Sequence, residues 1–378
     1  MKRRHLLTTL GGAALGGTLL VRPAFAADPS PILPSRAEVI AKLRLVNDHW
    51  INGHSNPGNN GWARATYFSG NMAAYRATNE VRYLQYARKW GQQNNFALSG
   101  GVGTRNADNH CAGQTYYDLY DIDRNPSYLT AINESIRLMV EGGNQSNSDW
   151  WWCDALHMAM PVFVRVGAHR GDNAYLNKMY SLYSYTKKQI SGKGLYNYTD
   201  ELWFRDSKFI WPNGSQSHSP NGQKVYWSRG NGWALAAHAK VIALLPPGDT
   251  RWPEYQWNIQ GMGRALRTRQ RLDGFWNVNL GDPQHYPGPE TSGTAFFTYG
   301  LAYGVRTGLL DSATYLPIIA KAWNGMVATA VHPNGFLGYV QGVGQRPSDS
   351  QPVTYNTTSD FGVGAFLMAA SEVARLTT

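Results

Sequence analysis

The chain of 378 residues contains only two cysteines, Cys111 and Cys153. Two thiols cannot supply the framework of a disulfide-stabilised scaffold, so the fold must depend on a hydrophobic core. The two could form one bridge in an exported protein, or they could be separate buried thiols. The sequence also lacks a cluster of cysteines and histidines with the spacing of metal ligands. We therefore expect neither a metal site nor a cofactor.

Charged residues are scarce as well, at 16% of the chain. The formal net charge is +10, and removal of the four basic residues Lys2, Arg3, Arg4 and Arg22 with an N-terminal leader would leave +6. Nucleic-acid binding would require a clustered basic face, whereas these basic residues are scattered among tryptophans and tyrosines. A modest positive charge instead suits an anionic substrate.

No segment after the leader is apolar enough to span a membrane. The leader itself has paired basic residues at 3–4, a Gly- and Ala-rich apolar run over 6–21 and a small-x-small cleavage motif at 24–26. The paired arginines resemble a twin-arginine signal, although an ordinary secretory signal also fits. We expect residues 1–26 to be a signal peptide, residues 27–378 to be a single catalytic domain, and the mature protein to be periplasmic or secreted.

What the chain does contain is a degenerate helical repeat. A helix of small and apolar residues is followed by a short turn and by a second helix that begins near a Tyr-Leu pair, as at Tyr83-Leu84. Six such pairs, at a period of roughly forty to eighty residues, predict an all-α (α/α)6 barrel with the small-residue helices in the inner ring. An open solenoid is the alternative, but it usually keeps a tighter period. The expected inner helices are 70–77, 113–120, 154–166, 232–245, 293–304 and 362–374, and the segment 37–50 would pair with the last of them.

The barrel prediction also locates an active site. Segments that lead from an outer helix into the next inner helix all emerge at the same end of such a barrel, and function concentrates where loops converge. In this chain they are the polar and aromatic segments. They are residues 103–113, 148–154, 225–232, 287–293 and 355–362.

The run from Asp149 to Asp154 places two carboxylates around three consecutive tryptophans. Tryptophan is costly to leave in water, so the three are expected to line a wall, a core or a sugar-binding face. A carboxylate against such a surface loses hydration, which raises its pKa, as a catalytic acid near neutral pH requires. Asp154 opens an inner helix and is the candidate acid, with helix capping as the alternative role. Asp149 is assigned to the loop.

Other candidates lie at the same predicted end. Asp108 precedes an inner helix, where a helix cap and a site role beside His110 are equally favoured. Arg229 presents a planar fork suited to a substrate carboxylate, or it pairs with a protein carboxylate such as Asp108. Trp233 could stack on a sugar ring. Further candidates for substrate contact are Trp62, Tyr67 and Trp152.

At these residues the chain resembles the unsaturated glycosyl hydrolases of glycoside hydrolase family 105 and the related unsaturated glucuronyl hydrolases of family 88. The motifs stand in the order that the family has. They are ADNHCAGQ at 107–114, WWWCDALHMAMP at 150–161, YWSRGNGWA at 226–234, ETSGTAFF at 290–297 and DFGVGAFLMAASEV at 360–373. The resemblance implies an (α/α)6 barrel and release of a Δ4,5-unsaturated uronic acid from the non-reducing end of lyase-generated oligosaccharides.

The resemblance also implies roles. Asp154 matches the residue that protonates the enol-ether double bond at C4 and assists water adding at C5, and Asp108 matches the second carboxylate of the pocket. Arg229 and Trp233 match positions that contact or stack on the uronate. Rhamnogalacturonyl-specific members carry a histidine in the stretch that corresponds to 202–206, where this chain has Arg205-Asp206. A glucuronyl-type substrate from another anionic polysaccharide is therefore the alternative.

Two other classes remain open from sequence. A polysaccharide lyase can share a helical barrel and a basic cleft, although lyases usually abstract the proton with Tyr, His or Lys. A carbohydrate-binding protein without activity would retain the aromatic platforms and show no turnover.

Overall fold

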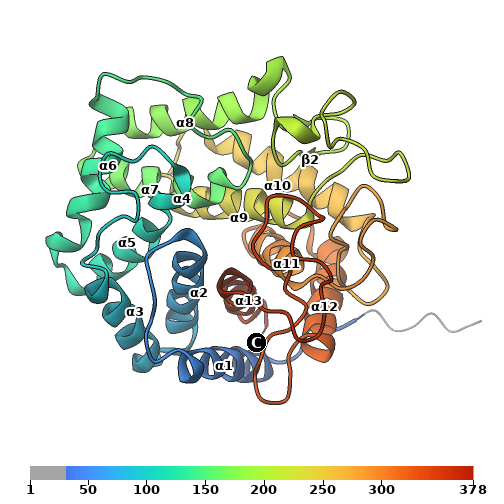
Figure 1. Cartoon of the computed structure of the whole chain (residues 1–378). Coiled ribbons are helices and arrows are strands. Elements are labelled where there is room, and N and C mark those ends of the chain that lie inside the picture. Colours follow the sequence, from blue (N-terminus) through green and yellow to red (C-terminus); the bar gives the residue numbers. More distant parts are fainter. Residues whose placement is uncertain (1–30, 378) are drawn as a thin grey trace, which may run out of the picture. The chain divides into compact units, whose positions relative to one another are not determined.

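The computed structural model describes residues 31–377, and in this part of the chain six helices form an inner ring (Figure 1). Each inner helix packs against the next one around the ring, and the last packs against the first. The inner helices are α2 (Trp62–Thr78), α5 (Ala112–Asp123), α7 (Ala155–Arg170), α9 (Ser228–Leu244), α11 (Thr291–Arg306) and α13 (Asp360–Val373).

A second layer of helices surrounds this ring. Each outer helix follows an inner one in the chain, except α1, which packs on α13 and so completes the layer. This arrangement confirms the predicted (α/α)6 barrel and the pairing of the first segment with the last inner helix. The outer helices are α3 (Val81–Gln93), α6 (Thr130–Glu141), α8 (Asn173–Lys188), α10 (Trp252–Arg267), α12 (Ser312–Thr329) and α1 (Arg36–Gly53).

Small residues allow the inner helices to approach closely where the ring closes. A Cβ atom added at Gly70 of α2 would stand 2.3 Å from the carbonyl oxygen of Gly364 in α13, and one added at Gly364 would stand 2.4 Å from the carbonyl oxygen of Thr66. Neither position tolerates a side chain without separating the two helices. The glycines thus fix the distance between the first and last inner helices.

Two inner helices begin well before the positions that the pattern predicted. Helix α2 starts at Trp62 rather than at Gly70, and α9 starts at Ser228 rather than at Gly232, so Gly230 and Gly232 both lie inside α9. Their role is close packing, because a Cβ at Gly232 would stand 2.9 Å from Cβ of Phe296.

The longest connection, between α8 and α9, carries structure that the repeat did not predict. Strands β1 (Tyr196–Asn197) and β2 (Leu202–Trp203) pair antiparallel, with Tyr196 opposite Trp203. The chain after β2 then crosses to the Trp run, where Cys153 N–H donates to the carbonyl of Arg205 at 2.8 Å. This connection brings Arg205 to the barrel end. The remaining short elements are α4 (Ala107–His110), η1 (Pro126–Leu129), η2 (Ile190–Gly192) and η3 (Ser207–Phe209).

Cys111 and Cys153 are both buried and both free, so the alternative of a bridge between them is wrong. Within residues 31–377, no helix is long and apolar enough to cross a membrane, and no group of three or more His, Cys, Asp or Glu side chains is arranged to hold a metal ion. The predicted signal peptide, residues 1–26, lies outside the described residues.

Candidate active site

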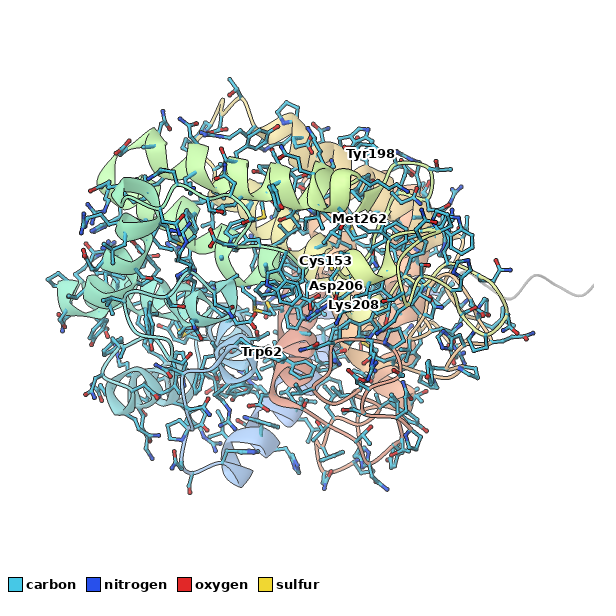
Figure 2. All side chains as sticks on the ribbon, turned by 45° about the horizontal axis from the view of Figure 1, so that its top comes forward. Trp62, Cys153, Tyr198, Asp206, Lys208 and Met262 are labelled. Atoms are coloured by element: carbon cyan, nitrogen blue, oxygen red, sulfur yellow. The ribbon has the colours of Figure 1, made fainter. Side chains whose placement is uncertain are left out.

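Asp154 stands at the N-terminus of α7, but its side chain does not cap the helix. Its Oδ2 faces Nε of Arg205 at 3.3 Å, and its Oδ1 accepts from the thiol of Cys153 at 3.5 Å. The side chain is almost fully buried. Figure 2 shows the neighbouring Cys153 and Asp206 together at the end of the barrel, in the region where the N-termini of the inner helices meet. The alternative of a capping role for Asp154 therefore does not apply.

The surroundings of Asp154 have opposing effects on its pKa. Burial raises the pKa of the carboxyl, whereas the charges of Arg205 and Arg229 and the bond from Cys153 lower it. Burial is the stronger effect, so the pKa lies above the usual range of an aspartate. Asp154 can therefore hold a proton closer to neutral pH than an exposed aspartate could.

Asp108 lies in the short helix α4 and is not its cap either. The cap is Asn106, whose side chain accepts from Asp108 N–H at 2.9 Å. Burial, together with the charge of Asp154, raises the pKa of Asp108 to about 7, although Arg205 acts to lower it. Two carboxyl groups that interact in this way cannot both ionise freely, so the site retains a proton near neutral pH.

Arg205 is the cation in direct contact with Asp154. Besides Asp154, its Nη1 donates to Oδ2 of Asp206 at 2.8 Å. Its guanidinium lies 5.4 Å from the ring centroid of Trp151, whose side chain is 49% exposed. Asp206 is itself held by the N–H of Lys208, which donates to its Oδ1 at 2.9 Å. From sequence, Arg205-Asp206 was noted only as a departure from the rhamnogalacturonyl pattern, and the contact between Arg205 and Asp154 was not predicted.

Arg229 is buried, and both terminal nitrogens of its guanidinium donate to backbone carbonyls. Nη1 donates to the carbonyl of Gln341 at 2.5 Å, and Nη2 to that of Gly342 at 2.8 Å. The ring centroids of Trp227 and Phe361 lie 4.4 and 4.7 Å from its guanidinium carbon. The alternative pairing of Arg229 with Asp108 is not observed. Arg229 ties α9 to the 341–342 segment and acts on Asp154 by its charge.

Trp233 is buried among side chains of the inner helices, so it offers no open face for a sugar ring. It is 1% exposed and packs against Phe296 and His157, with ring centroids 4.3 and 4.8 Å away. Trp62 lies partly exposed and stacks on Phe361 at 5.2 Å. Of these two predicted aromatic contacts, the structure leaves only Trp62 accessible.

Three further predicted contacts are core residues. Tyr67 points to the outer layer, where its hydroxyl donates to Oδ1 of Asn47 at 2.8 Å, and Nε2 of His110 lies 3.1 Å from the hydroxyl of Ser135. Both side chains are fully buried, and Trp152 is nearly so. Their substrate-binding assignment is therefore corrected, because no part of Tyr67 or His110 reaches the surface. Burial lowers the pKa of His110 to about 4, which keeps it neutral.

The three tryptophans do not form one wall. Trp150 is fully buried and packs edge-on against Phe163 of α7 at 5.6 Å, whereas Trp151 is the exposed one. Asp149 pairs with Arg105 at 2.6 Å, in agreement with its assignment to the loop. From sequence, Trp151 was not singled out as the exposed member of the run. Consecutive side chains point in different directions, so the three tryptophans could not all face the same surface.

An (α/α)6 barrel with two carboxyls of raised pKa near the N-terminal ends of its inner helices fits a carbohydrate-processing enzyme of the helical-barrel class. The chain belongs to Glycosyl Hydrolase Family 88, whose profile matches residues 40–377. The suspected resemblance to families 105 and 88 is thereby confirmed, and the protein is a glycoside hydrolase.

Individual relatives agree with this assignment. The chain is 31% identical over 331 residues to an unsaturated 3S-rhamnoglycuronyl hydrolase of Formosa agariphila, covering 83% of this chain and 84% of the relative. A solved glycosyl hydrolase family 88 structure from Bacteroides vulgatus has a TM-score of 0.84 at 34% identity, with 90% of this chain and 99% of that chain covered. A structure described as a polysaccharide lyase has a TM-score of 0.83 at 36% identity, with 90% and 98% covered.

Proposed function

We propose that the protein releases the non-reducing-end Δ4,5-unsaturated uronic acid from lyase-generated oligosaccharides by hydration of the enol-ether double bond. The observation that carries the proposal is the pair Asp154 and Asp108, two carboxyls at the barrel end whose pKa values burial raises. A double bond of this kind needs a proton donor, and a buried carboxyl with a raised pKa is one.

In the proposed reaction, Asp154 gives its proton to C4 of the unsaturated residue. Water then adds at C5 and returns a proton to Asp154, so the carboxyl ends in its starting state. The hemiketal at C5 opens to a ketone, the ring oxygen takes the proton, and the hemiacetal now present at C1 releases the rest of the oligosaccharide. The anomeric carbon is not attacked by a protein nucleophile, so the distance between the two carboxyls does not predict retention or inversion.

For the substrate we propose a rhamnoglycuronyl type. Two relatives, from Formosa agariphila and an Alteromonas species, carry that name at 31% and 29% identity, whereas a rhamnogalacturonyl hydrolase of Bacillus subtilis is 22% identical. The Arg205-Asp206 pair beside Asp154 also departs from the histidine of the rhamnogalacturonyl pattern. Trp62 and Trp151, both accessible, would provide the apolar surfaces for the sugar.

The test follows ultraviolet absorbance, because the enol-ether absorbs and its hydration product does not. Purified protein would be incubated with lyase-generated fragments of pectin, ulvan, arabinogalactan and glycosaminoglycans, with Asp154→Asn as the inactive control. Loss of absorbance with one group of fragments supports the proposal and identifies the parent polysaccharide. Stable absorbance with every fragment contradicts it.

A lyase is the second candidate, because a structure described as a polysaccharide lyase is 36% identical to this chain. A lyase creates the enol-ether, so incubation with intact polysaccharide would increase the absorbance. The same assay therefore separates the two candidates by the sign of the change.

We also propose that residues 1–26 export the enzyme to the periplasm or out of the cell, by the twin-arginine route. The support is the paired Arg3-Arg4, the apolar run that follows and the cleavage motif at 24–26. Replacement of both arginines by lysine should retain the full-length chain inside the cell, as fractionation would show. Unchanged export would point to an ordinary secretory signal.

A further inference from the structure

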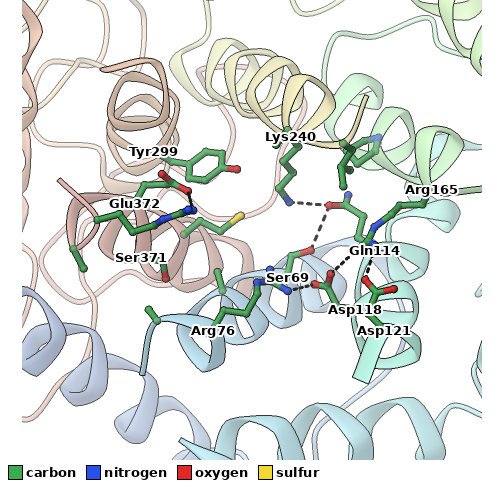
Figure 3. A pocket seen from close by; sticks show the side chains of 18 of the residues that line it. Ser69, Arg76, Gln114, Asp118, Asp121, Arg165, Lys240, Tyr299, Ser371 and Glu372 are labelled. Carbon is green, nitrogen blue, oxygen red and sulfur yellow. Dashed lines mark hydrogen bonds and ion pairs between the residues drawn. The ribbon is translucent and has the colours of Figure 1, made fainter. Parts of the chain in front are cut away.

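A cavity of about 600 Å³ lies toward the C-terminal ends of the inner helices, away from Asp154, and the proposed reaction does not use it (Figure 3). All six inner helices contribute side chains to this far cavity, so it lies on the axis of the ring. Arg76 and Arg375 line it too, and their side chains are 55% and 57% exposed. The far cavity therefore reaches solvent, and its volume is that of a small-molecule site.

The carboxylates that line the far cavity already have cations, whereas one of its lysines does not. The printed pairs are Asp118 with Arg76 and Arg165, Asp121 with Arg165, and Glu372 with Arg306 and Arg375. Lys240 of α9 lines the same space, and within residues 31–377 it forms no ion pair. An added anion would therefore compete for Lys240 with no protein carboxylate in direct contact.

The amine of Lys240 is held in place and has donors to spare. It donates one hydrogen bond, to Oε1 of Gln114 at 2.8 Å, which leaves two N–H groups. Gln114 is fixed in turn, because its Nε2 donates to the carbonyl of His157 at 2.7 Å. Burial lowers the pKa of Lys240 to about 8, and the charge of Asp118 offsets this only in part. An anion beside the amine would stabilise its charged form.

The helix macrodipole does not account for this lysine. The C-terminal ends of helices favour basic residues, but the effect falls off within the last turn. Helix α9 ends at Leu244, so Lys240 lies more than one turn before its end. Its place on the axis of the ring needs another explanation.

Tyr299 of α11 offers a second donor to the same space. Figure 3 shows its hydroxyl directed toward Lys240, and it makes no hydrogen bond to any other residue that the structure describes. Burial raises the pKa of Tyr299, so the phenol stays protonated and can donate. An ammonium group and a phenol O–H that face one space are suited to bind an oxygen anion between them.

We propose that the far cavity is a binding site for a small hydroxylated carboxylate of the size of a sugar acid, with its carboxylate between Lys240 and Tyr299. The single uncompensated charge matches a monoanion. Ser69 and Ser371 provide hydroxyl oxygens for its polar groups, and Met368 provides apolar surface for its C–H groups. The site does not depend on the proposed function.

The test measures acetylation of Lys240 by a limiting amount of an N-hydroxysuccinimide ester of acetic acid, with D-glucuronate as the probe. A bound carboxylate keeps the amine charged and covers it. Sodium D-glucuronate should slow modification of Lys240 saturably, by about tenfold, as peptide mass spectrometry would show. Exposed Lys188, followed in the same sample, should react at an unchanged rate.

D-glucose and sodium chloride at equal concentrations provide the chemical controls and should protect neither lysine. An unchanged rate at Lys240, or equal protection by glucose or chloride, would overturn the proposal. So would a Lys240 that the reagent does not reach without a ligand, because the far cavity would then be closed to small molecules.

Two variants locate the binding. Tyr299→Phe keeps the ring and removes one donor, so about tenfold more D-glucuronate should be needed to protect Lys240. In thermal unfolding, D-glucuronate should raise the midpoint of the wild type more than that of Lys240→Met, since a ligand stabilises only the fold that binds it. Lys188→Met is the matched control and should respond like the wild type. Equal rises in the wild type and Lys240→Met would contradict the site.

These measurements need no turnover, so their outcome is separate from that of the proposed function. Asp154→Asn should lose activity and still protect Lys240 as the wild type does. If Asp154→Asn loses the protection, D-glucuronate acts from the other end of the barrel and the far site is wrong.

Discussion

The two ends of the barrel both contain aspartates, but the pKa values of these aspartates are shifted in opposite directions. At the N-terminal ends of the inner helices, Asp108 has a pKa raised to about 7. Toward the C-terminal ends, Asp118 of α5 is also partly buried, and burial alone would raise its pKa, but Arg76 and Arg165 outweigh that effect and lower it. Figure 3 shows this far end, where Asp118 is paired with both arginines at 3.1 and 2.8 Å.

The far end also holds a cavity of about 600 Å³. Its other carboxylates are paired as well, Asp121 with Arg165 at 2.5 Å and Glu372 with Arg306 at 2.6 Å. None of the predicted site residues lines it. The comparison teaches that carboxyls with raised pKa values distinguish the end proposed for acid chemistry from the end that holds this cavity.

The sharpest way to break this comparison is to make the same substitution at both ends. Asp154→Asn should lower kcat about a thousandfold or more, because the amide cannot donate the proton. Asp118→Asn should leave kcat nearly unchanged and destabilise the fold by about 3 kcal/mol, since two arginines lose their counter-charge. Absorbance assays and denaturant unfolding would measure the two effects. Near-normal turnover by Asp154→Asn would contradict the assignment of the acid.

A second prediction uses the pH dependence of stability. The folded pKa of Asp108 is about 7 and an unfolded aspartate has about 4, so wild-type stability falls as the pH rises through this window. Asp108→Asn lacks this penalty and should unfold at a higher temperature than the wild type at pH 8, with the difference vanishing toward pH 4.

Asp118→Asn is the matched control and should show the opposite sign. The folded pKa of Asp118 is lowered, so its ion pairs contribute stability above about pH 4 that is lost as the pH falls. Thermal unfolding of both variants from about pH 2 to pH 8 would measure the differences. Equal shifts in the two variants would mean that the ends do not differ in pairing.

The smallest expected effect concerns Lys240 of α9, which lines the far cavity. Its amine donates to Oε1 of Gln114 at 2.8 Å, and burial lowers its pKa to about 8. Charging it at pH 7 therefore costs stability, a cost that disappears as the pH rises above about 10. Lys240→Met should raise the midpoint of thermal unfolding by about 2 to 4 °C at pH 7, with kcat unchanged.

Exposed Lys188 provides the control for that variant, because Lys188→Met removes an equal charge from the surface. It should leave the unfolding midpoint in place. A loss of turnover in Lys240→Met would instead show that the far end takes part in the reaction.

The barrel was predictable because six helix starts share one composition, and small residues such as Gly70 and Gly364 reveal which helices must approach closely. The capping alternatives for Asp154 and Asp108 could be judged only from coordinates, since cap and catalyst occupy the same position in sequence. The direction of the Tyr67 side chain could not be predicted either. It points to the outer layer, where its hydroxyl donates to Asn47.

Arg229 and Arg205 show why the contacts themselves were not predictable. The carbonyl partners of Arg229 lie more than a hundred residues along the chain, in a segment with no repeat signal. Arg205 reaches Asp154 through a hairpin connection that belongs to no helix pair. For both arginines the sequence shows that a guanidinium is present. Its hydrogen-bond partners come from distant parts of the chain, so they could not be predicted.

The contact between α2 and α13 determines when, during synthesis of the chain, the barrel can close. Arg64 and Asp360 form an ion pair at 2.7 Å across 296 residues, next to the point where the glycines of the two helices meet. A ribosome must therefore synthesise nearly the whole polypeptide before the ring can close. Until then the incomplete arc exposes the apolar flank of α2, so a chain truncated ahead of Asp360 should aggregate instead of forming a smaller enzyme.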